Sequence, residues 1–143
     1  LDQKLAVVTG AAQGLGKAMA EAMADCGANI AILDLNVDEA VETAKYIESK
    51  YNVKARAFQV NVADADACHE VVEKICKEWQ HIDVLLNNAG ICINEDAENV
   101  PLENWHKVID INMNGVWYMS QAVGKIMIKQ NHGNDQITGG RMG

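Results

Sequence analysis

The sequence has no apolar run long enough to cross a membrane, and its first residues lack the basic-then-apolar order of a signal peptide. Basic residues are also scarce, because 12 Lys and Arg stand against 20 Asp and Glu, for a formal net charge of −8. No basic stripe is left to attract a nucleic acid or an anionic membrane. These absences predict a cytoplasmic protein that has neither kind of partner.

Cysteine and histidine lack the spacing of a redox or metal site. None of the four cysteines forms a Cys-x-x-Cys pair, and the patterns around Cys26, Cys68 and Cys76 place these residues in helices as small apolar side chains. The histidines are scattered without ligand spacing, at His69, His81, His106 and His132. The sequence therefore predicts a reduced protein without a metal.

Short apolar runs alternate strictly with segments of helical periodicity. The runs, at 5–8, 28–33, 54–60 and 82–86, suit buried parallel strands. With right-handed crossovers, this alternation predicts an α/β fold, a doubly wound parallel sheet of the Rossmann type, in residues 1–130. The chain of 143 residues is 49% apolar, enough for one domain with a sizeable core. Residues 131–143 form a tail that fits no element of this plan.

Three helical segments have apolar stripes that we expect to face the sheet. In the first helix the stripe is Leu15, Ala18, Met19, Ala22 and Cys26. In residues 37–51 it is Ala40, Val41, Ala44, Ile47 and Tyr51. In the third it is Cys68, Val71, Val72, Ile75 and Trp79.

Three glycines stand between the first strand and the first helix, in the order Gly10-x-x-x-Gly14-x-Gly16. Glycine permits backbone conformations and close approaches that a β-carbon would forbid. The free amides and the positive dipole end of the helix then form a candidate cradle for a phosphate or pyrophosphate. No Gly-Lys-Ser/Thr ending follows, which argues against ATP or GTP chemistry. An ordinary glycine-rich turn is the alternative.

The second apolar run ends on Asp34, 18 positions beyond Gly16. A dinucleotide-binding unit places a carboxylate at about this distance to accept hydrogen bonds from the adenosine ribose hydroxyls. A 2′-phosphate there would meet like charge, and neither Gln13 nor Leu35 supplies a cation. Asp34 thus favours NAD over NADP, unless it serves only to end the strand.

Taken together, these motifs and two later ones resemble the short-chain dehydrogenase/reductase family. The matching stretches are Thr9-Gly-Ala-Ala-Gln-Gly-Leu-Gly16, Asp34, Asn61-Val-Ala-Asp64 and Asn87-Asn-Ala-Gly90. The resemblance covers roughly residues 1–130. It implies an NAD(P)-dependent oxidoreductase that transfers a hydride between a carbinol or ketone, a small-molecule substrate, and the nicotinamide.

The resemblance also implies which residues bind the cofactor. Asn61 stands where the family has Asp, and its side-chain oxygen can accept the same hydrogen bond from the adenine amino group. Thr9 and Asn87 are expected to lock the strand ends together. The cofactor-binding residues implied are Gly10, Gln13, Gly14, Leu15, Gly16, Asp34, Asn61, Val62, Asn88, Ala89 and Gly90.

A long segment after Pro101 keeps helical phase, and Asn112 interrupts its apolar stripe. The stripe is Trp105, Val108, Ile109, Asn112, Val116, Met119, Val123, Ile126 and Met127. A buried amide costs roughly 1 to 3 kcal/mol when unpaired, so we expect a partner for Asn112, and Asn114-Gly115 permits a kink. The residues alone favour a core Asn paired with a freed backbone carbonyl. The resemblance implies instead the catalytic asparagine that holds a water in the family's proton relay.

The family's Ser, Tyr and Lys have no counterparts in their expected places. Tyr46-Ile-Glu-Ser-Lys50 matches Tyr-x-x-x-Lys, but we expect it at the opposite edge of the sheet, on a solvated face with Glu39, Glu42 and Thr43. The chain therefore reads as an N-terminal fragment with an exposed edge on its fourth strand, homo-oligomeric when full length. Two further hypotheses are an inactive NAD-binding module and an interaction protein. The latter would use a helix surface of Trp117, Met119, Ile126 and Met127.

Overall fold

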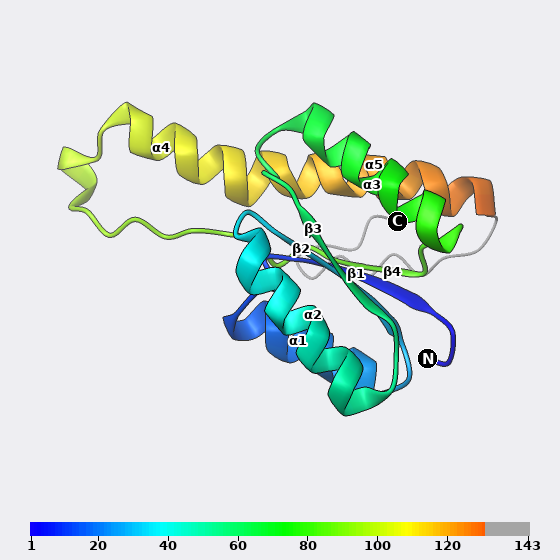
Figure 1. The fold of residues 1–143 in the computed structure, drawn as a ribbon. Helices are drawn as coiled ribbons and strands as arrows, with labels where there is room; N and C mark the ends of the chain where they lie inside the picture. Colours follow the sequence, from blue (N-terminus) through cyan, green and yellow to red (C-terminus); the bar gives the residue numbers. More distant parts are fainter. Residues whose placement is uncertain (131–143) are drawn as a thin grey trace.

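The computed structural model describes residues 1–130, which form a parallel sheet between two layers of helices (Figure 1). The predicted tail, residues 131–143, lies outside the described residues. Within them, the strand order is β3-β2-β1-β4. The strands are β1 (Leu5–Thr9), β2 (Asn29–Asp34), β3 (Ala55–Gln59) and β4 (Val84–Leu86), all parallel. The chain runs outward from β1 to β3 and then returns to the other side of β1, which opens a crevice between the loops after β1 and β4.

Helices α1 (Gly14–Asp25) and α2 (Val37–Tyr51) cover one face, and α3 (Ala65–Trp79) and α5 (Gly115–Gln130) cover the other (Figure 1). Alternate residues of β1 divide between the two cores. Leu5 and Val7 pack in the core that includes α3 and α5, whereas Ala6 and Val8 pack in the core that includes α1 and α2. The predicted doubly wound α/β fold is therefore confirmed.

The face of α1 that packs on the sheet differs from the predicted stripe. Most of that stripe is exposed: Leu15, Ala18, Ala22 and Cys26. The buried residues, spaced one turn apart, are Gly16, Ala20 and Ala24. A Cβ on Gly16 would collide with the carbonyl oxygen of Gly10. The helix thus lies too close to the first loop for large side chains, and a search for large apolar residues selects the wrong face.

In α2 and α3 most of the predicted stripe is buried, with two differences in α2. Val41 is exposed, and Thr43, expected on a solvated face, is buried. The reason is a hydrogen bond, because the Thr43 hydroxyl donates to the carbonyl oxygen of Ala12 in the glycine-rich loop. In α3 the predicted Cys68, Val71, Val72 and Ile75 are all buried.

In place of the single helix expected after Pro101, the structure has three consecutive elements, namely α4 (Leu102–Ile109), a π-helical turn, η2 (Asp110–Asn114), and α5. A further short turn, η1 (Ala97–Asn99), lies before Pro101. No residue of α4 or η2 is buried, so the stripe predicted from Trp105 onward covers the core only from α5. Figure 1 shows why, since α4 extends past the end of the sheet.

Gly115, at the predicted kink, has an ordinary helical backbone. A Cβ at this position would lie 2.9 Å from Cγ2 of Val62. The glycine therefore allows α5 to pack against the segment after β3.

Met119 and Met127, proposed above as part of an interaction surface, are buried in the core between the sheet, α3 and α5. The predicted interaction surface therefore does not include these two residues.

Strand β4 lies at the edge of the sheet formed by the described residues. The side chain of Gln130 bonds both backbone groups of Ile82, just before β4, since its Oε1 accepts from the amide at 2.8 Å and its Nε2 donates to the carbonyl at 2.9 Å. A carboxamide thus takes the place of a neighbouring strand at this residue.

Asp83 joins the beginning of β1 to the segment before β4. Its carboxylate accepts hydrogen bonds from the Leu5 amide at 2.8 Å and from the Lys4 ammonium at 3.0 Å, and His81 Nε2 lies 3.3 Å away. Burial raises the pKa of Asp83, but the Leu5 amide and the Lys4 charge together lower it more, so the pKa lies below its ordinary value. The ionised carboxylate therefore stabilises the folded chain.

We expect Asp83→Asn to lower the free energy of unfolding by about 1 to 3 kcal/mol at neutral pH. Because the folded pKa is lowered, this contribution is present above the unfolded pKa of about 4 and is lost as the pH falls through the folded value. Urea unfolding of both proteins at several pH values measures it. The difference between them should shrink on acidification, and a difference that stays constant would contradict this role of Asp83.

Candidate cofactor-binding site

The three glycines of the loop between β1 and α1 have different structural roles. Gly10 and Gly14 have φ of 62° and 59°, in the left-handed region that favours glycine. A Cβ on Gly10 would lie 2.8 Å from Cα of Ala89, and one on Gly16 would collide with the loop itself. A Cβ on Gly14 would meet nothing within 4 Å. Gly10 and Gly16 therefore allow close packing, whereas Gly14 faces open space.

The first turn of α1 has no side-chain cap. Gln13, at the N-cap position, is extended and makes no capping hydrogen bond, and the first turn carries no acidic residue. The amides of this turn and the positive end of the helix dipole therefore face the opening beside Gly14. This arrangement suits an anionic group such as a pyrophosphate. Leu15, also assigned to the cofactor from the sequence, has a side chain that is 76% exposed at the same turn.

Asp34, at the end of β2, is held beside the glycine-rich loop. Its Oδ2 accepts a hydrogen bond from the Ala12 amide at 3.0 Å, and its Oδ1 accepts one from the Asn36 amide at 3.0 Å. Each carboxylate oxygen can accept a further hydrogen bond. No ion pair joins Asp34 to a cation within residues 1–130. The side chain is thus oriented but still able to bind hydroxyl groups.

A pocket of about 160 Å³ lies at the carboxyl edge of the sheet. Six of the eleven predicted cofactor residues line it: Gly10, Asp34, Asn61, Val62, Ala89 and Gly90. The remaining lining residues are Leu33, Leu35, Val60, Ile91 and Ile111. The loops after all four strands of the described chain therefore meet at one place, as the sequence predicts. The sequence does not single out Ile91 and Ile111, because neither carries a polar group or belongs to a strict motif.

Thr9 holds the beginning of the loop after β4. Its hydroxyl oxygen accepts hydrogen bonds from the amides of Asn88 at 3.0 Å and Ala89 at 3.1 Å. The Asn88 side chain in turn donates to the carbonyls of Thr9 at 3.2 Å and Gly10 at 3.0 Å. Thr9 therefore locks the two loops together as predicted, and Asn88 contributes through its side chain. Asn87 donates to the Ser120 hydroxyl at 3.1 Å and so contacts α5.

Asn61, directly after Val60 at the end of the third strand segment, stands on the rim of the pocket. Its Oδ1 accepts a hydrogen bond from the Ala63 amide at 3.1 Å. This bond shapes the turn toward α3, whose N-cap Asp64 accepts from the Ala67 amide. The side-chain oxygen can accept a second hydrogen bond, which leaves it available for an amino group.

Asn112 is exposed, so the expectation of a buried amide is wrong. It lies in η2, beyond the end of the sheet, where no core covers it. The expected partner exists, because Asn112 Nδ2 donates to the Ile91 carbonyl and its Oδ1 accepts from the Ile91 amide, both at 2.8 Å. The carboxamide therefore fixes the loop after β4 against the π-helical turn, next to the pocket.

The Tyr46-x-x-x-Lys50 pair lies away from this pocket. Lys50 Nζ donates to the Tyr46 hydroxyl at 2.8 Å, and hydrogen bonds to Tyr46 and Tyr51 raise the pKa of Lys50 above its ordinary value. Both Tyr46 and Lys50 are exposed, and neither lines the pocket. Lys50 also forms an ion pair with Glu21 at 3.4 Å. The pair thus joins α2 to α1.

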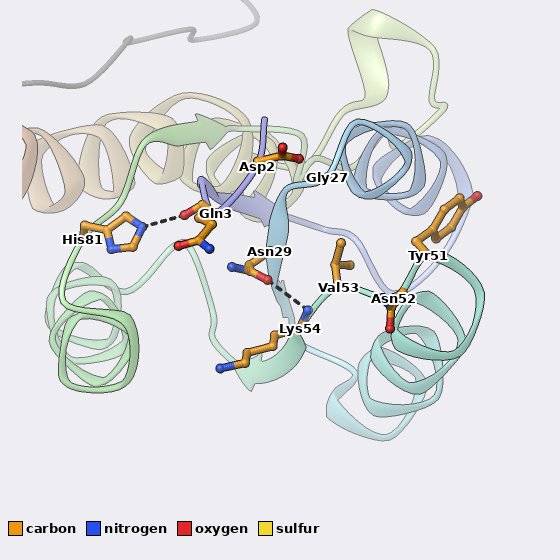
Figure 2. A pocket seen from close by; sticks show the side chains of 9 residues that line it. All are labelled: Asp2, Gln3, Gly27, Asn29, Tyr51, Asn52, Val53, Lys54 and His81. Atoms are coloured by element: carbon orange, nitrogen blue, oxygen red, sulfur yellow. Dashed lines mark hydrogen bonds between the residues drawn. The ribbon is translucent and has the colours of Figure 1, made fainter.

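A second, larger depression of about 830 Å³ lies at the opposite edge of the sheet, shown in Figure 2. Its lining residues lie before the strands or at the first residue of β2: Asp2, Gln3, Gly27, Asn29, Tyr51, Asn52, Val53, Lys54 and His81. Figure 2 shows hydrogen bonds from His81 to Gln3 and from Lys54 to Asn29 at its rim. None of the residues implied by the sequence motifs lines this depression.

Within residues 1–130, no three acidic, histidine or cysteine side chains gather as metal ligands. In the same part of the chain, no helix combines the length and hydropathy needed to cross a bilayer.

The four cysteines are free. Burial raises the pKa of Cys68 to about 11, whereas Cys26, expected to be buried in a helix, is exposed at the end of α1.

Known proteins are similar to this chain in sequence and in fold. The short chain dehydrogenase family model matches residues 4–134. Sorbose reductase from Candida albicans is 38% identical over 145 residues, which cover 100% of this chain and 51% of that protein. An NAD⁺-bound xylitol dehydrogenase has a TM-score of 0.91 and 29% identity, covering 95% of this chain and 52% of that one. An alcohol dehydrogenase from the archaeon Thermococcus sibiricus, complexed with 5-hydroxy-NADP, has a TM-score of 0.88 and 28% identity, covering 94% and 57%.

The chain spans about half the length of the relatives it matches. The matched region contains the whole described sheet, the glycine-rich loop after β1 and the loop after β4. The family model covers well over half of the chain and agrees with both the sequence motifs and the strand order. This protein therefore belongs to the short-chain dehydrogenase/reductase family.

Proposed function

We propose that this chain is the cofactor-binding half of an NAD-dependent oxidoreductase that transfers a hydride between a carbinol or ketone and nicotinamide. The convergence of Gly10, Asp34, Asn61, Ala89 and Gly90 on one pocket is the observation that carries the proposal. The names of the relatives, a sorbose reductase and a xylitol dehydrogenase, support a sugar or polyol as substrate. We further propose a cytoplasmic, homo-oligomeric full-length enzyme.

The residues present fit a dinucleotide along the carboxyl edge of the sheet. The uncapped first turn of α1 and the open space beside Gly14 suit the pyrophosphate. The Asp34 carboxylate would accept from the adenosine ribose hydroxyls, while Asn61 and Val62 would contact the adenine. Ala89 and Gly90 would line the path toward the nicotinamide ribose. The bound nicotinamide supplies the hydride chemistry.

Asn112 would act in this half of the enzyme through the loop that it holds. Both polar atoms of its carboxamide are engaged by Ile91, so its side chain orients the loop beside the pocket. The role in a proton relay that the family resemblance implies would then involve the backbone of the π-helical turn or a water bound near it. π-helical turns interrupt the regular hydrogen-bond ladder and often occur at functional sites.

The preference for NAD rests on Asp34. Its carboxylate has no cation beside it within the described residues, so a 2′-phosphate would meet an uncompensated negative charge. The ribose hydroxyls of NAD would instead donate to its free lone pairs. The solved relatives include complexes with NAD⁺ and with an NADP derivative, so the family match leaves both cofactors open, and the proposed preference depends on Asp34 alone.

We expect Asp34→Ser to weaken NAD⁺ binding by roughly 10- to 100-fold, the loss of a charged hydrogen bond of about 1.5 to 3 kcal/mol. Binding of NADP⁺ should become tighter because the repulsion is removed. Isothermal titration of each nucleotide into the 143-residue chain measures both. Asp38→Ser, an exposed acid in the first turn of α2, serves as the control and should leave both affinities unchanged. A wild-type chain that prefers NADP⁺ would contradict the assignment of Asp34.

A second candidate function is an NAD-binding module without turnover. It is favoured by one sequence observation, namely that the family's Ser, Tyr and Lys have no counterparts in their expected places among these 143 residues. Incubating the chain with NAD⁺ and a panel of polyols, while following the absorbance of the reduced cofactor, separates the two functions. Binding with reduction supports the oxidoreductase, binding alone supports the module, and the absence of binding would contradict both.

A further inference from the structure

We infer that Thr43, on α2, is a positioning residue for nucleotide recognition, because its hydroxyl fixes Ala12, the residue of the glycine-rich loop whose amide orients Asp34. This inference rests on the proposed function and adds a specificity determinant to it. No sequence motif points to Thr43, and the helical pattern of α2 places it on the solvated face.

The contact involves two buried groups. The Thr43 side chain is 3% exposed, and its hydroxyl donates to the carbonyl oxygen of Ala12 at 2.6 Å. Ala12 itself is 2% exposed. A buried carbonyl needs a hydrogen-bond donor, and removal of the donor costs the full desolvation of that group. The hydroxyl is therefore required where it is, on a helix face otherwise made of apolar side chains.

The other polar group of Ala12 leads to the nucleotide site. Its amide donates to Oδ2 of Asp34 at 3.0 Å, so Ala12 is held by α2 through its carbonyl and holds Asp34 through its amide. Together with the Asn36 amide, which donates to Oδ1 of Asp34, this bond sets the direction in which the free lone pairs of the carboxylate point. Thr43 thus acts on the carboxylate through one loop residue.

The position of Ala12 within the loop extends this effect to the pyrophosphate side. Earlier in the loop, the amides of Gly10 and Ala11 donate to the carbonyl of Leu33, at 2.7 and 3.4 Å. Later, Gln13 is exposed and Gly14 faces open space. Ala12 is therefore the last loop residue that bonds to segments outside α1, since the next residue, Gln13, accepts from the Lys17 amide within the helix at 3.2 Å. If the carbonyl of Ala12 lost its donor, the peptide leading into this turn would be free to rotate.

The test compares Thr43→Val, which keeps the shape but removes the hydroxyl, with Thr43→Ser, which keeps the hydroxyl. Titrations of NAD⁺ and NADP⁺ into the 143-residue chain yield both dissociation constants, and thermal unfolding reports stability. We expect Thr43→Val to weaken NAD⁺ binding about tenfold, the equivalent of one buried hydrogen bond, and to reduce the preference for NAD⁺ over NADP⁺. Thr43→Ser should restore both within about threefold.

A structural role alone would lower stability without changing the preference. Ile75→Val, in the core on the other face of the sheet, is the matched control, because it lowers the melting temperature by a change far from the loop. It should bind both nucleotides as the wild type does. In an Asp34→Ser background, Thr43→Val should cost much less affinity, since the two residues act in one chain of contacts.

Each outcome decides the inference. If the wild type binds NAD⁺ and Thr43→Val binds it equally well with the same preference, the inference is wrong and the proposed function stands. If the wild type binds neither nucleotide, both are wrong. If Thr43→Val does not fold, Thr43→Cys carries the same comparison, because a thiol tolerates burial but donates only weakly.

Discussion

Gly14→Val is expected to raise the dissociation constant for NAD⁺ at least about 100-fold while the chain remains folded. A Cβ at Gly14 meets no protein atom within 4 Å, so the valine side chain would stand in the open space beside the first turn of α1. That space is where we propose that the pyrophosphate accepts hydrogen bonds from the backbone. The left-handed φ of 59° adds a conformational cost of roughly 1 to 2 kcal/mol, which lowers stability but leaves the packing intact.

Gly124→Val is the matched control for this experiment. A Cβ on Gly124 also meets nothing within 4 Å, but Gly124 lies in α5, on the other face of the sheet. Isothermal titration should show wild-type affinity for this variant, and circular dichroism should show that both variants are folded. Wild-type affinity for Gly14→Val would mean that the pyrophosphate does not lie at this turn.

Gly16→Ala is expected to act on the fold itself. Its Cβ would collide with the carbonyl oxygen of Gly10 and lie 2.9 Å from Cα of Ala11, two backbone positions that no rotamer change can move. Overpacking of this kind costs about 1 to 3 kcal/mol, and we expect the upper end because backbone must shift. α1 would move away from β1, the first loop would open, and nucleotide affinity would fall together with stability.

The control for this change lies again in α5. Gly124→Ala adds the same methyl group to a helix where it meets no atom within 4 Å, so it should raise the free energy of unfolding by up to about 1 kcal/mol. Urea unfolding of the three proteins measures the two effects. Equal stability of Gly16→Ala and the wild type would show that the close approach of α1 to the loop is dispensable.

The pocket residues could be predicted because buried strands are visible in the sequence as short apolar runs, and the loops directly follow them. Short apolar runs that alternate with helical segments predicted the strands, and the parallel arrangement brought Asp34, Asn61 and Ala89 to one edge. The sequence also predicted that the three glycines form a tight loop before α1, but it did not predict the separate role of each glycine. Whether a glycine serves packing or leaves space depends on its neighbours, and for Gly16 these include Asn88, far along the chain.

Thr43 and Asn112 show what the helical pattern could not predict. The pattern places polar residues on the outside, yet Thr43 is buried by a hydrogen bond to a loop 31 residues earlier in the chain. Asn112 interrupts an apolar stripe and was therefore expected in a core, but η2 carries it past the end of the sheet. Both errors arise because the burial of a side chain depends on the segment that packs against the helix. The periodicity of the helix itself carries no information about that segment.

The sequence by itself determined the α/β fold, the glycine-rich loop, the acid at the end of β2 and the family, since these depend on local pattern and on spacing along the chain. Only the tertiary structure decided which face of α1 meets the sheet, that Ala12 connects Thr43 to Asp34, and that Asn112 pairs with Ile91. These features depend on distances between segments far apart in the chain. A hydrogen bond or a close approach between such segments has no periodic pattern in the sequence by which it could be predicted.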